Sequence, residues 1–242
     1  FLGLRNLTII QESLRFIKEN QNQNIDLSTV SYNDKKTYEL LSSGETTGIF
    51  QLESSGMRRY IKDLRPTSIF DLQAMVALYR PGPMANIPEF IRRKHNPSLI
   101  KYPDPRLSDI LKESYGVFTF QDDVLLTAIK VAGYSWLEVD KLRKAIGKKI
   151  PSEMKKQHDQ FVEGCVINGM NRRNAEQFWI LFEPFAGYGF NKAHAAGYAT
   201  IAFRTAYLKA HFSVEFMTAL LTAESRGTTG PVKNEKIAQA IA

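Results

Sequence analysis

The sequence predicts a mainly α-helical protein with a few short strands. Apolar residues recur three and four positions apart along most of the chain, which is the spacing of one helix face. Residues that start helices precede these periodic segments, and Gly or Pro often follows them. Hydrophobic residues make up 43% of the 242 positions, so the chain can bury a substantial core.

Four helices and one strand are predicted in the first third of the chain. Each helix begins near a residue whose side chain can accept a hydrogen bond from a free backbone amide. In order, these residues are Asn6, Asp34, Ser55 and Ser68, with Asp71 completing a capping box at the fourth helix. The stretch GIFQLES (48–54) is predicted to be a short strand.

A rigid bend and a long loop are predicted to follow. In RPGP (80–83), two prolines flank a glycine, which excludes a regular helix. Residues 92–116 are predicted to be loop, apart from one short helix at about 107–112. VFTFQ (117–121) has the alternation of a second short strand.

Helices dominate the remainder of the chain. They are predicted to begin near Asp122, Ser135, Ser152 and Asn171, with Glu138 completing a capping box for Ser135. A further helix is predicted to run through about residue 210, and a last one to cover about 213–223. SRGTTGP (225–231) then forms a turn-rich break.

The charge balance and cysteine content limit the class of protein. Lys and Arg total 32 against 25 for Asp and Glu, and the net charge of +7 favours a polyanionic partner. The single Cys165 excludes an internal disulfide and fits a reducing compartment, so a cytoplasmic location is predicted. No apolar run reaches membrane-spanning length, so no membrane partner is expected. Because the first residue is Phe1, the chain is expected to be a cut or processed piece.

A basic helix at 136–149 is the first candidate binding site. Five cations fall within nine residues, and they are Lys141, Arg143, Lys144, Lys148 and Lys149. Spacing alone favours a solvated basic face, the commonest fate of such a run. The alternative is a phosphate-binding site, because cations on a rigid helix can neutralise a triphosphate.

The glycine-rich segment AGYGFNKAHAAGY (186–198) is the second candidate. Tyr188 stands between two glycines, and Asn191, Lys192 and His194 follow at the start of a helix. Free backbone amides at a helix start favour anions, so a nucleotide with its base against Tyr188 is one interpretation. A strained structural turn is the other.

Other polar residues point to structure rather than chemistry. Arg80 precedes Pro81 and is held in extended backbone, which suits a structural corner more than a contact. The histidines and Cys165 lack metal-ligand spacing. No cluster of catalytic carboxylates is evident, since Asp122 and Asp123 are adjacent and would diverge on a helix.

Several long motifs, in order, resemble the alpha subunits of bacterial DNA polymerase III, the C-family replicative DNA polymerases. They are FLGLRNLT (1–8), GIFQLESSGM (48–57), LYRPGP (78–83), LRKAIGKK (142–149), FAGYGFNKAHAAGYA (185–199) and TAYLKAHFSVEFMTALLTAE (205–224). The resemblance covers essentially residues 1–225. It implies a helical fingers domain at 9–225, the end of the palm at 1–8, and a turn-rich break with the start of a further helical segment at 226–242.

The resemblance also implies roles for individual residues. The family's pair of fingers cations that contacts the incoming triphosphate falls on Arg143 and Lys144, where Lys replaces the usual second Arg. The tyrosine at the nucleotide pocket falls on Tyr188, followed by Asn191, Lys192 and His194, with Ala193 in place of the usual serine. Arg80, Lys148 and Lys149 become candidate contacts to DNA or phosphate.

The metal and the partners are likewise implied by the resemblance. In the family, Mg²⁺ is bound by palm carboxylates, one of which immediately precedes the motif at Phe1, so this chain alone is expected to be inactive. The expected partners are primer–template DNA, dNTPs, the remaining palm and thumb, a sliding clamp and other replisome subunits. The alternative is a non-catalytic basic helical module for DNA binding or assembly.

Overall fold

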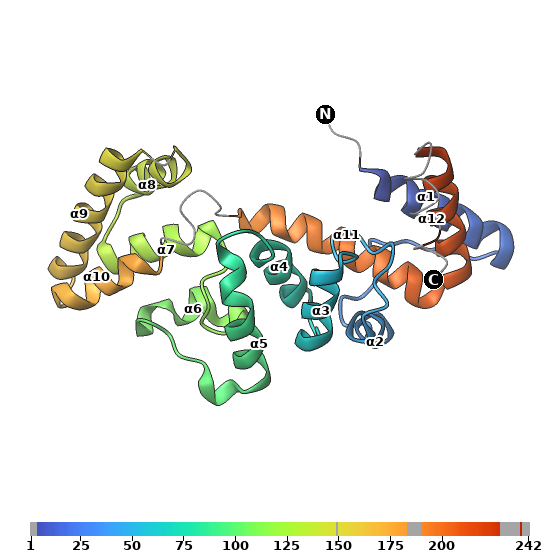
Figure 1. Cartoon of the computed structure of the whole chain (residues 1–242), viewed down its shortest axis with the longest axis horizontal. Helices are drawn as coiled ribbons and strands as arrows, with labels where there is room; N and C mark the ends of the chain where they lie inside the picture. Colours follow the sequence, from blue (N-terminus) through green and yellow to red (C-terminus); the bar gives the residue numbers. More distant parts are fainter. Residues whose placement is uncertain (1–3, 149, 183–189, 228–237, 239–242) are drawn as a thin grey trace. The chain divides into compact units, whose positions relative to one another are not determined.

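The computed structural model describes residues 4–148, 150–182, 190–227 and 238. Within these ranges the chain is helical and contains no strand, which confirms the mainly α fold class. The chain divides into two compact units (Figure 1), one formed by residues 1–72 and 197–242 and the other by residues 73–196. The predicted palm and fingers boundaries stay predictions. None of the described helices is both long and apolar enough to cross a membrane.

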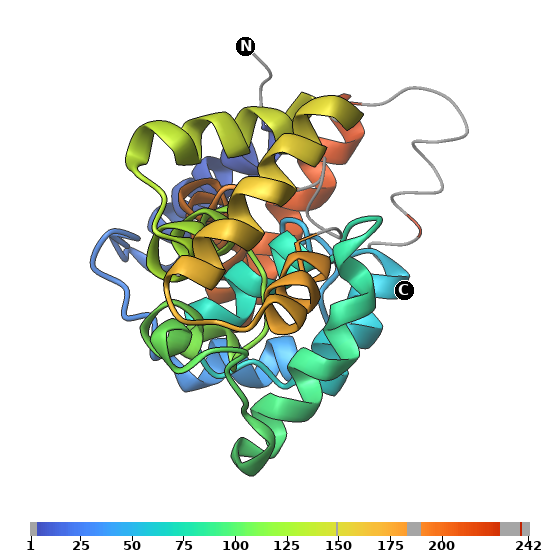
Figure 2. The same ribbon diagram turned by 90° about the vertical axis from the view of Figure 1, so that its left-hand side faces the viewer.

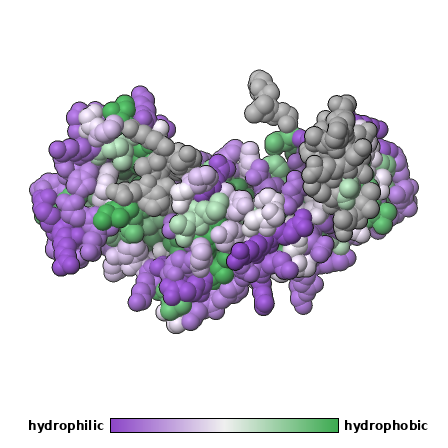
Figure 3. Space-filling model, in the orientation of Figure 1, coloured by the Kyte–Doolittle hydropathy of each residue, from purple (hydrophilic) through white to green (hydrophobic). Residues whose placement is uncertain are grey.

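The first unit pairs a helix from the start of the sequence with one from its last third. Its helices are α1 (Arg5–Gln21), α2 (Lys35–Ser43), α3 (Ser55–Leu64) and α12 (Ser213–Gly227), while α4 (Ile69–Leu78) and α11 (Lys192–His211) belong to both units. Helices α1 and α12 lie side by side (Figure 1) and bury Ile9, Ile17 and Phe216. Helix α3 buries its apolar face, and Figure 3 shows strongly hydrophilic residues over this helix.

The second unit is built around α9. Its further helices are α5 (Ile87–His95), α6 (Ser108–Leu111), α7 (Gln121–Ala132), α8 (Trp136–Lys148), α9 (Pro151–Ile167) and α10 (Arg172–Ile180). Short 3₁₀ turns lie at Pro83–Asn86, Pro97–Leu99, Pro105–Leu107 and Lys112–Ser114. Helix α9 packs against α7, α8 and α10, and Figure 2 shows α8, α9 and α10 toward the viewer.

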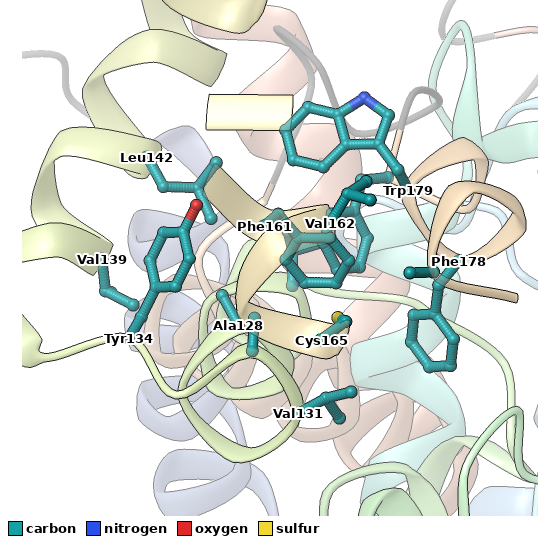
Figure 4. Close-up of a cluster of buried hydrophobic side chains, with 14 of the residues drawn as sticks. Ala128, Val131, Tyr134, Val139, Leu142, Phe161, Val162, Cys165, Phe178 and Trp179 are labelled. Atoms are coloured by element: carbon teal, nitrogen blue, oxygen red, sulfur yellow. The ribbon is translucent and has the colours of Figure 1, made fainter. Parts of the chain in front are cut away.

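Phe161 of α9 lies at the centre of this second core. Its ring is fully buried and lies 4.9 Å from that of Phe182 and 5.6 Å from that of Trp179, measured between ring centroids. Figure 4 shows Val139 and Leu142 of α8 in the same cluster. The core that surrounds Phe161 therefore also fixes the position of α8.

Four of the predicted caps form, whereas α3 is capped by Ser54 rather than Ser55 and α9 has no side-chain cap at Ser152. The side chain of Asp34 accepts a hydrogen bond from the Thr37 amide (2.8 Å), and that of Asn171 accepts one from the Asn174 amide (2.8 Å). Both predicted capping boxes form, at Ser68 with Asp71 and at Ser135 with Glu138. These hydrogen bonds satisfy amides that have no partner within the helix.

Three predictions about helices were wrong. The last helix, α12, continues to Gly227 and so includes the first three residues of the predicted break at 225–231. Asn6 does not cap the first helix, because α1 begins at Arg5 with Leu4 as its N-cap. The predicted loop at 92–116 is helical at its start, because α5 continues to His95. Pro88 in the first turn of α5 is compatible with helix, since the amide that it lacks would have no partner there.

Both predicted strands were wrong. Residues 48–54 form successive turns, with left-handed backbone at Gly48 (φ 78°) and Gln51 (φ 62°), and they bury Ile49 and Leu52. The segment 117–121 is not part of a sheet. The amides of Thr119 and Phe120 donate instead to Oδ2 of Asp123, at 2.9 and 2.8 Å. Alternating apolar residues are buried here by packing against helices.

Asp123 makes the stability of the chain depend on pH. Burial raises the pKa of Asp123 to about 7, although hydrogen bonds from the Phe120 and Thr119 amides act in the opposite direction. A carboxyl whose pKa is raised on folding stabilises the folded chain below its unfolded pKa, and this contribution is lost as the pH rises through about 7. Asp123→Asn cannot ionise but keeps an oxygen acceptor for the two amides.

We therefore expect Asp123→Asn to reduce the loss of stability between pH 5 and pH 8. The measurement is the free energy of unfolding in urea at both pH values for the chain and the variant. The exposed Asp109→Asn serves as a control and should retain the pH dependence of the unsubstituted chain. An equal pH dependence in all three proteins would contradict the role of Asp123.

Candidate functional site

Helix α8 presents its cations to solvent because its apolar residues face the core. Val139, Leu142 and Ile146 are buried, and the capping box at Ser135 fixes the start of the helix. On the other side, the exposed cations are Lys141, Arg143, Lys144 and Lys148. The predicted basic face is therefore present on a helix that the core holds in place. Lys149 lies outside the described residues.

Asp140 forms ion pairs with two of these cations. Its Oδ1 accepts hydrogen bonds from Nη2 of Arg143 at 2.7 Å and from Nε at 3.1 Å, and its Oδ2 lies 2.7 Å from Nζ of Lys144. The side chains of Arg143 and Lys144 are 48% and 59% exposed, so both are accessible to a ligand. Hydrogen bonds from Lys144 and then Arg143 lower the pKa of Asp140. One carboxylate thus positions both cations and neutralises part of their charge.

Three lysines of α8 line a shallow hollow beside this group. Lys141, Lys144 and Lys148 border a volume of about 230 Å³ together with Ala145, Ile150 and Glu153. Their spacing of three and four residues places them on one face, as the sequence predicts. Lys144 belongs both to the hollow and to the ion pairs of Asp140, so it connects the two parts of the basic face.

The start of α11 does not offer all the free backbone amides that the sequence predicts. Two of the backbone amides that were expected to be free already have partners. The Lys192 amide donates to Oδ2 of Asp122 (2.7 Å), and the His194 amide donates to Oδ1 of Asn191 (3.0 Å). Asn191 is thus a helix cap, and an anion at these amides would have to displace a carboxylate or an amide oxygen.

The side chains at this position are also engaged. Nζ of Lys192 lies 2.9 Å from Oε2 of Glu113 and 5.6 Å from the centre of the Phe120 ring. Both ionic side chains are about one third exposed. Lys192 therefore anchors α11 to the segment before α7, and a ligand could reach its ammonium only at the edge of this contact.

Arg80 lies next to the residues at the start of α11. Its guanidinium stacks over the Phe190 ring at 3.8 Å, and the His194 ring meets the same phenylalanine edge-on with centroids 5.0 Å apart. The RPGP bend holds the backbone here, with Gly82 at φ 96°, a conformation that favours glycine. Arg80 is therefore both part of a structural corner and a neighbour of the predicted site residue His194.

The predicted site residues thus form two groups in the described part of the chain. One is on α8, and the other joins Arg80 to Asn191, Lys192 and His194. Tyr188 lies outside the described residues. The sequence reasoning did not identify Asp140, although its spacing of three and four residues from Arg143 and Lys144 is that of helix ion pairs. Phe190 was not identified either, and nothing local in the sequence indicates its contact with Arg80.

The described residues do not fit a metal site. No group of three or more His, Cys, Asp or Glu side chains that could hold a metal ion occurs among them. Asp122 and Asp123 diverge as expected, because they accept hydrogen bonds from different backbone segments. The site on α8 therefore offers cations and one carboxylate, a set that suits phosphate binding rather than metal binding.

Comparisons with known proteins relate this chain to the same family as the motifs do. A family model described as the bacterial DNA polymerase III alpha subunit finger domain matches residues 6–169. A DNA polymerase III subunit alpha from Bacillus subtilis is 47% identical over 223 residues, which are 92% of this chain and 20% of that protein. The Thermus aquaticus protein of the same name is 45% identical over 229 residues, 93% of this chain and 19% of that protein.

A third relative, the DNA polymerase III subunit alpha of Xylella fastidiosa, is 46% identical over 233 residues, or 94% of this chain and 20% of its own length. The chain thus spans about a fifth of the length of the curated relatives that it matches. Because the family model matches more than half of the chain, the chain belongs to the family of bacterial DNA polymerase III alpha subunit finger domains.

Proposed function

We propose that this chain is the part of a bacterial replicative DNA polymerase that binds the incoming dNTP and contacts template DNA. The observation that carries this proposal is the group on α8, where Arg143 and Lys144 are exposed and share one carboxylate. The matched family and the names of its relatives support a polymerase rather than another phosphate-binding protein. The relatives are about five times longer, so the activity belongs to the full-length parent.

The triphosphate would bind by replacing Asp140. Arg143 offers two nitrogen donors that already bind one carboxylate oxygen, and a phosphate group presents oxygen acceptors of the same kind. Lys144 adds a point charge, where the usual arginine of the family would add a second planar donor group. Because α8 is fixed by the core, both cations would be in place before the nucleotide arrives.

The remaining predicted residues are assigned to the same nucleotide or to the DNA. Tyr188 is proposed to contact the base and sugar, with Asn191, Lys192 and His194 close to it in sequence. Lys192 would contribute charge only by exchanging its partner Glu113, as Arg143 exchanges Asp140. Arg80, Lys148 and Lys149 are proposed contacts to DNA or phosphate. The stacking of Arg80 on Phe190 would hold its guanidinium in one position.

The proposed reaction is nucleotidyl transfer to a primer 3′-hydroxyl. The Mg²⁺ ions that such a reaction uses are proposed to bind carboxylates outside this chain, and the chain itself binds and orients the nucleotide. The proposed partners are primer–template DNA, the remaining palm and thumb of the parent, a sliding clamp and other replisome subunits. The proposed location is the bacterial cytoplasm.

Substitution of Asp140 tests the proposed exchange at α8. In the full-length parent, Asp140→Asn should lower the apparent KM for dNTP by at most about fivefold, because the ion pairs that compete with the nucleotide are exposed and weak. The measurement is the dNTP dependence of primer extension.

Glu163→Gln is the matched control for Asp140→Asn. Glu163 pairs with the exposed Arg172 at 2.7 Å, so this variant makes the same change in charge at an exposed ion pair elsewhere. Its KM for dNTP should be unchanged. An increased KM in Asp140→Asn would show that the carboxylate positions the cations without competing with the nucleotide, and the exchange would then be wrong.

A further inference from the structure

Helix α3 carries a second group of cations, in the other compact unit of the chain. They are Arg58, Arg59, Lys62 and, at the C-cap, Arg65. The apolar residues Met57, Ile61 and Leu64 are buried, which places the polar positions of the helix on its outer face. Ser55, Arg58, Arg59, Lys62 and Asp63 line a surface hollow of about 410 Å³.

Three of these cations have no neutralising partner among the residues that the structure describes. In the described part of the chain, Arg59, Lys62 and Arg65 form neither a salt bridge nor a side-chain hydrogen bond, and all three are exposed. This is the opposite of α8, where Asp140 pairs with both Arg143 and Lys144. An exposed basic face is often only solvated, but solvated lysines and arginines on helices commonly pair with acids three or four positions away.

The packing around α3 also fixes two of the cations. Nη2 of Arg58 donates to Oγ1 of Thr47 (3.1 Å) and to the Glu53 carbonyl (3.4 Å), while its Nε is buried. The aliphatic part of Lys62 lies against Gly44, where an added Cβ would come within 2.6 Å of its Cδ. These contacts hold part of each side chain in place, which reduces the freedom lost when the residues bind a ligand.

The loop at residues 45–47, which contacts Arg58, is itself held by hydrogen bonds from Lys209. Nζ of Lys209 donates to the carbonyls of Glu45 (2.8 Å) and Thr47 (2.9 Å). Burial lowers the pKa of Lys209, and the charge of Glu45 acts in the opposite direction.

We propose that α3 carries a separate anion-binding site, in which Arg58, Arg59, Lys62 and Arg65 bind phosphate groups. Arg59 and Lys62 lie three residues apart within the helix, so their Cβ atoms are about 5–6 Å apart and both side chains can reach one phosphate. The hollow of about 410 Å³ is open to solvent and can admit a phosphate group. The phosphates belong to a nucleic-acid strand or to a free polyphosphate. This proposal does not rest on the nucleotide site at α8.

The test compares two double variants of the chain. Arg59→Gln with Lys62→Gln removes two cations of the proposed site, and Lys35→Gln with Lys36→Gln makes the same charge change on exposed α2. Binding of a labelled oligothymidylate is measured by anisotropy at several salt concentrations, and binding of inorganic pyrophosphate by calorimetry. Circular dichroism checks that each variant keeps its helix content.

We expect the α3 variant to bind the oligothymidylate about tenfold more weakly and to reduce the slope of log K against log salt by about 1.4, as for two lost contacts to a single strand. The α2 variant should stay within twofold of the unsubstituted chain. A loss confined to pyrophosphate would assign the site to free polyphosphates. Equal losses in the two variants, or no loss of either ligand in the α3 variant, would overturn the proposal. Arg143→Gln on α8 should leave the difference between the α2 and α3 variants unchanged, so this test is independent of the proposed nucleotide site.

Discussion

Arg143→Ala in the full-length parent should lower kcat/KM for dNTP incorporation by about tenfold to a hundredfold. A hydrogen bond to a charged group contributes about 1.5–3 kcal/mol, and this arginine offers at least two donors to the triphosphate. Both a higher KM for dNTP and a lower incorporation rate are expected, because charge on the phosphates also changes in the transition state. The measurement is single-nucleotide primer extension over a range of dNTP concentrations.

The matched control is Arg172→Ala on α10. Arg172 is also exposed and also forms one ion pair, with Glu163 at 2.7 Å, but it belongs to neither group of site residues. Its kcat/KM should be unchanged. If a stably folded Arg143→Ala enzyme shows the dNTP dependence of the unsubstituted parent, α8 does not bind the triphosphate and its basic face is merely solvated.

Local interactions explain why most helices could be predicted. Asp34 and Asn171 cap helices through amides only three residues away, so the cap and its partner lie in one short stretch of sequence. The two strand predictions failed for the opposite reason. The apolar residues of 48–54 are buried by the surrounding fold rather than by a sheet. Gln51 has left-handed backbone, and glutamine is not a residue type that indicates such a turn.

In the candidate site, too, features set by nearby residues could be predicted, and those set by distant residues could not. The exposure of Arg143 and Lys144 follows from helical periodicity, and Asp140 lies close enough in sequence to have been included. The contacts at the start of α11 join residues that are far apart in sequence. Lys192 pairs with Glu113, 79 residues away, and its amide is bonded by Asp122, 70 residues away. No spacing rule within one element predicts such contacts, so the availability of the α11 amides was overestimated.

The cations of α3 were overlooked for a different reason. Arg58, Arg59 and Lys62 lie within five residues and were visible in the sequence, but Asp63 stands beside them and suggests a balanced, solvated face. Only the structure shows which cations have partners. Charge counts along a sequence therefore identify candidate anion sites less well than the ion pairs of the folded chain do.

The largest loss of stability is expected for Phe161→Ala. The Phe161 side chain is fully buried and contacts four aromatic rings from two other segments, one with Tyr134 and one with Trp179. Removal of a buried Phe side chain costs about 3–5 kcal/mol, since the lost burial is accompanied by a cavity that rigid neighbours fill only in part. The four surrounding rings have few ways to move inward, which favours the upper part of this range.

Tryptophan fluorescence during urea unfolding measures this loss in the relevant unit. Both tryptophans of the chain belong to that unit, and only Trp179 is buried, whereas Trp136 is 72% exposed. The signal therefore reports the core around Phe161 even if the other unit unfolds separately. The control is Ile167→Ala on the same helix, where the side chain is 77% exposed and the expected change is within about 0.5 kcal/mol. Val139 and Leu142 of α8 pack in the same cluster as Phe161. If Phe161→Ala lowers the free energy of unfolding by less than about 1 kcal/mol, Phe161 is not central to this core, and the core does not hold the cations of α8 in place as argued.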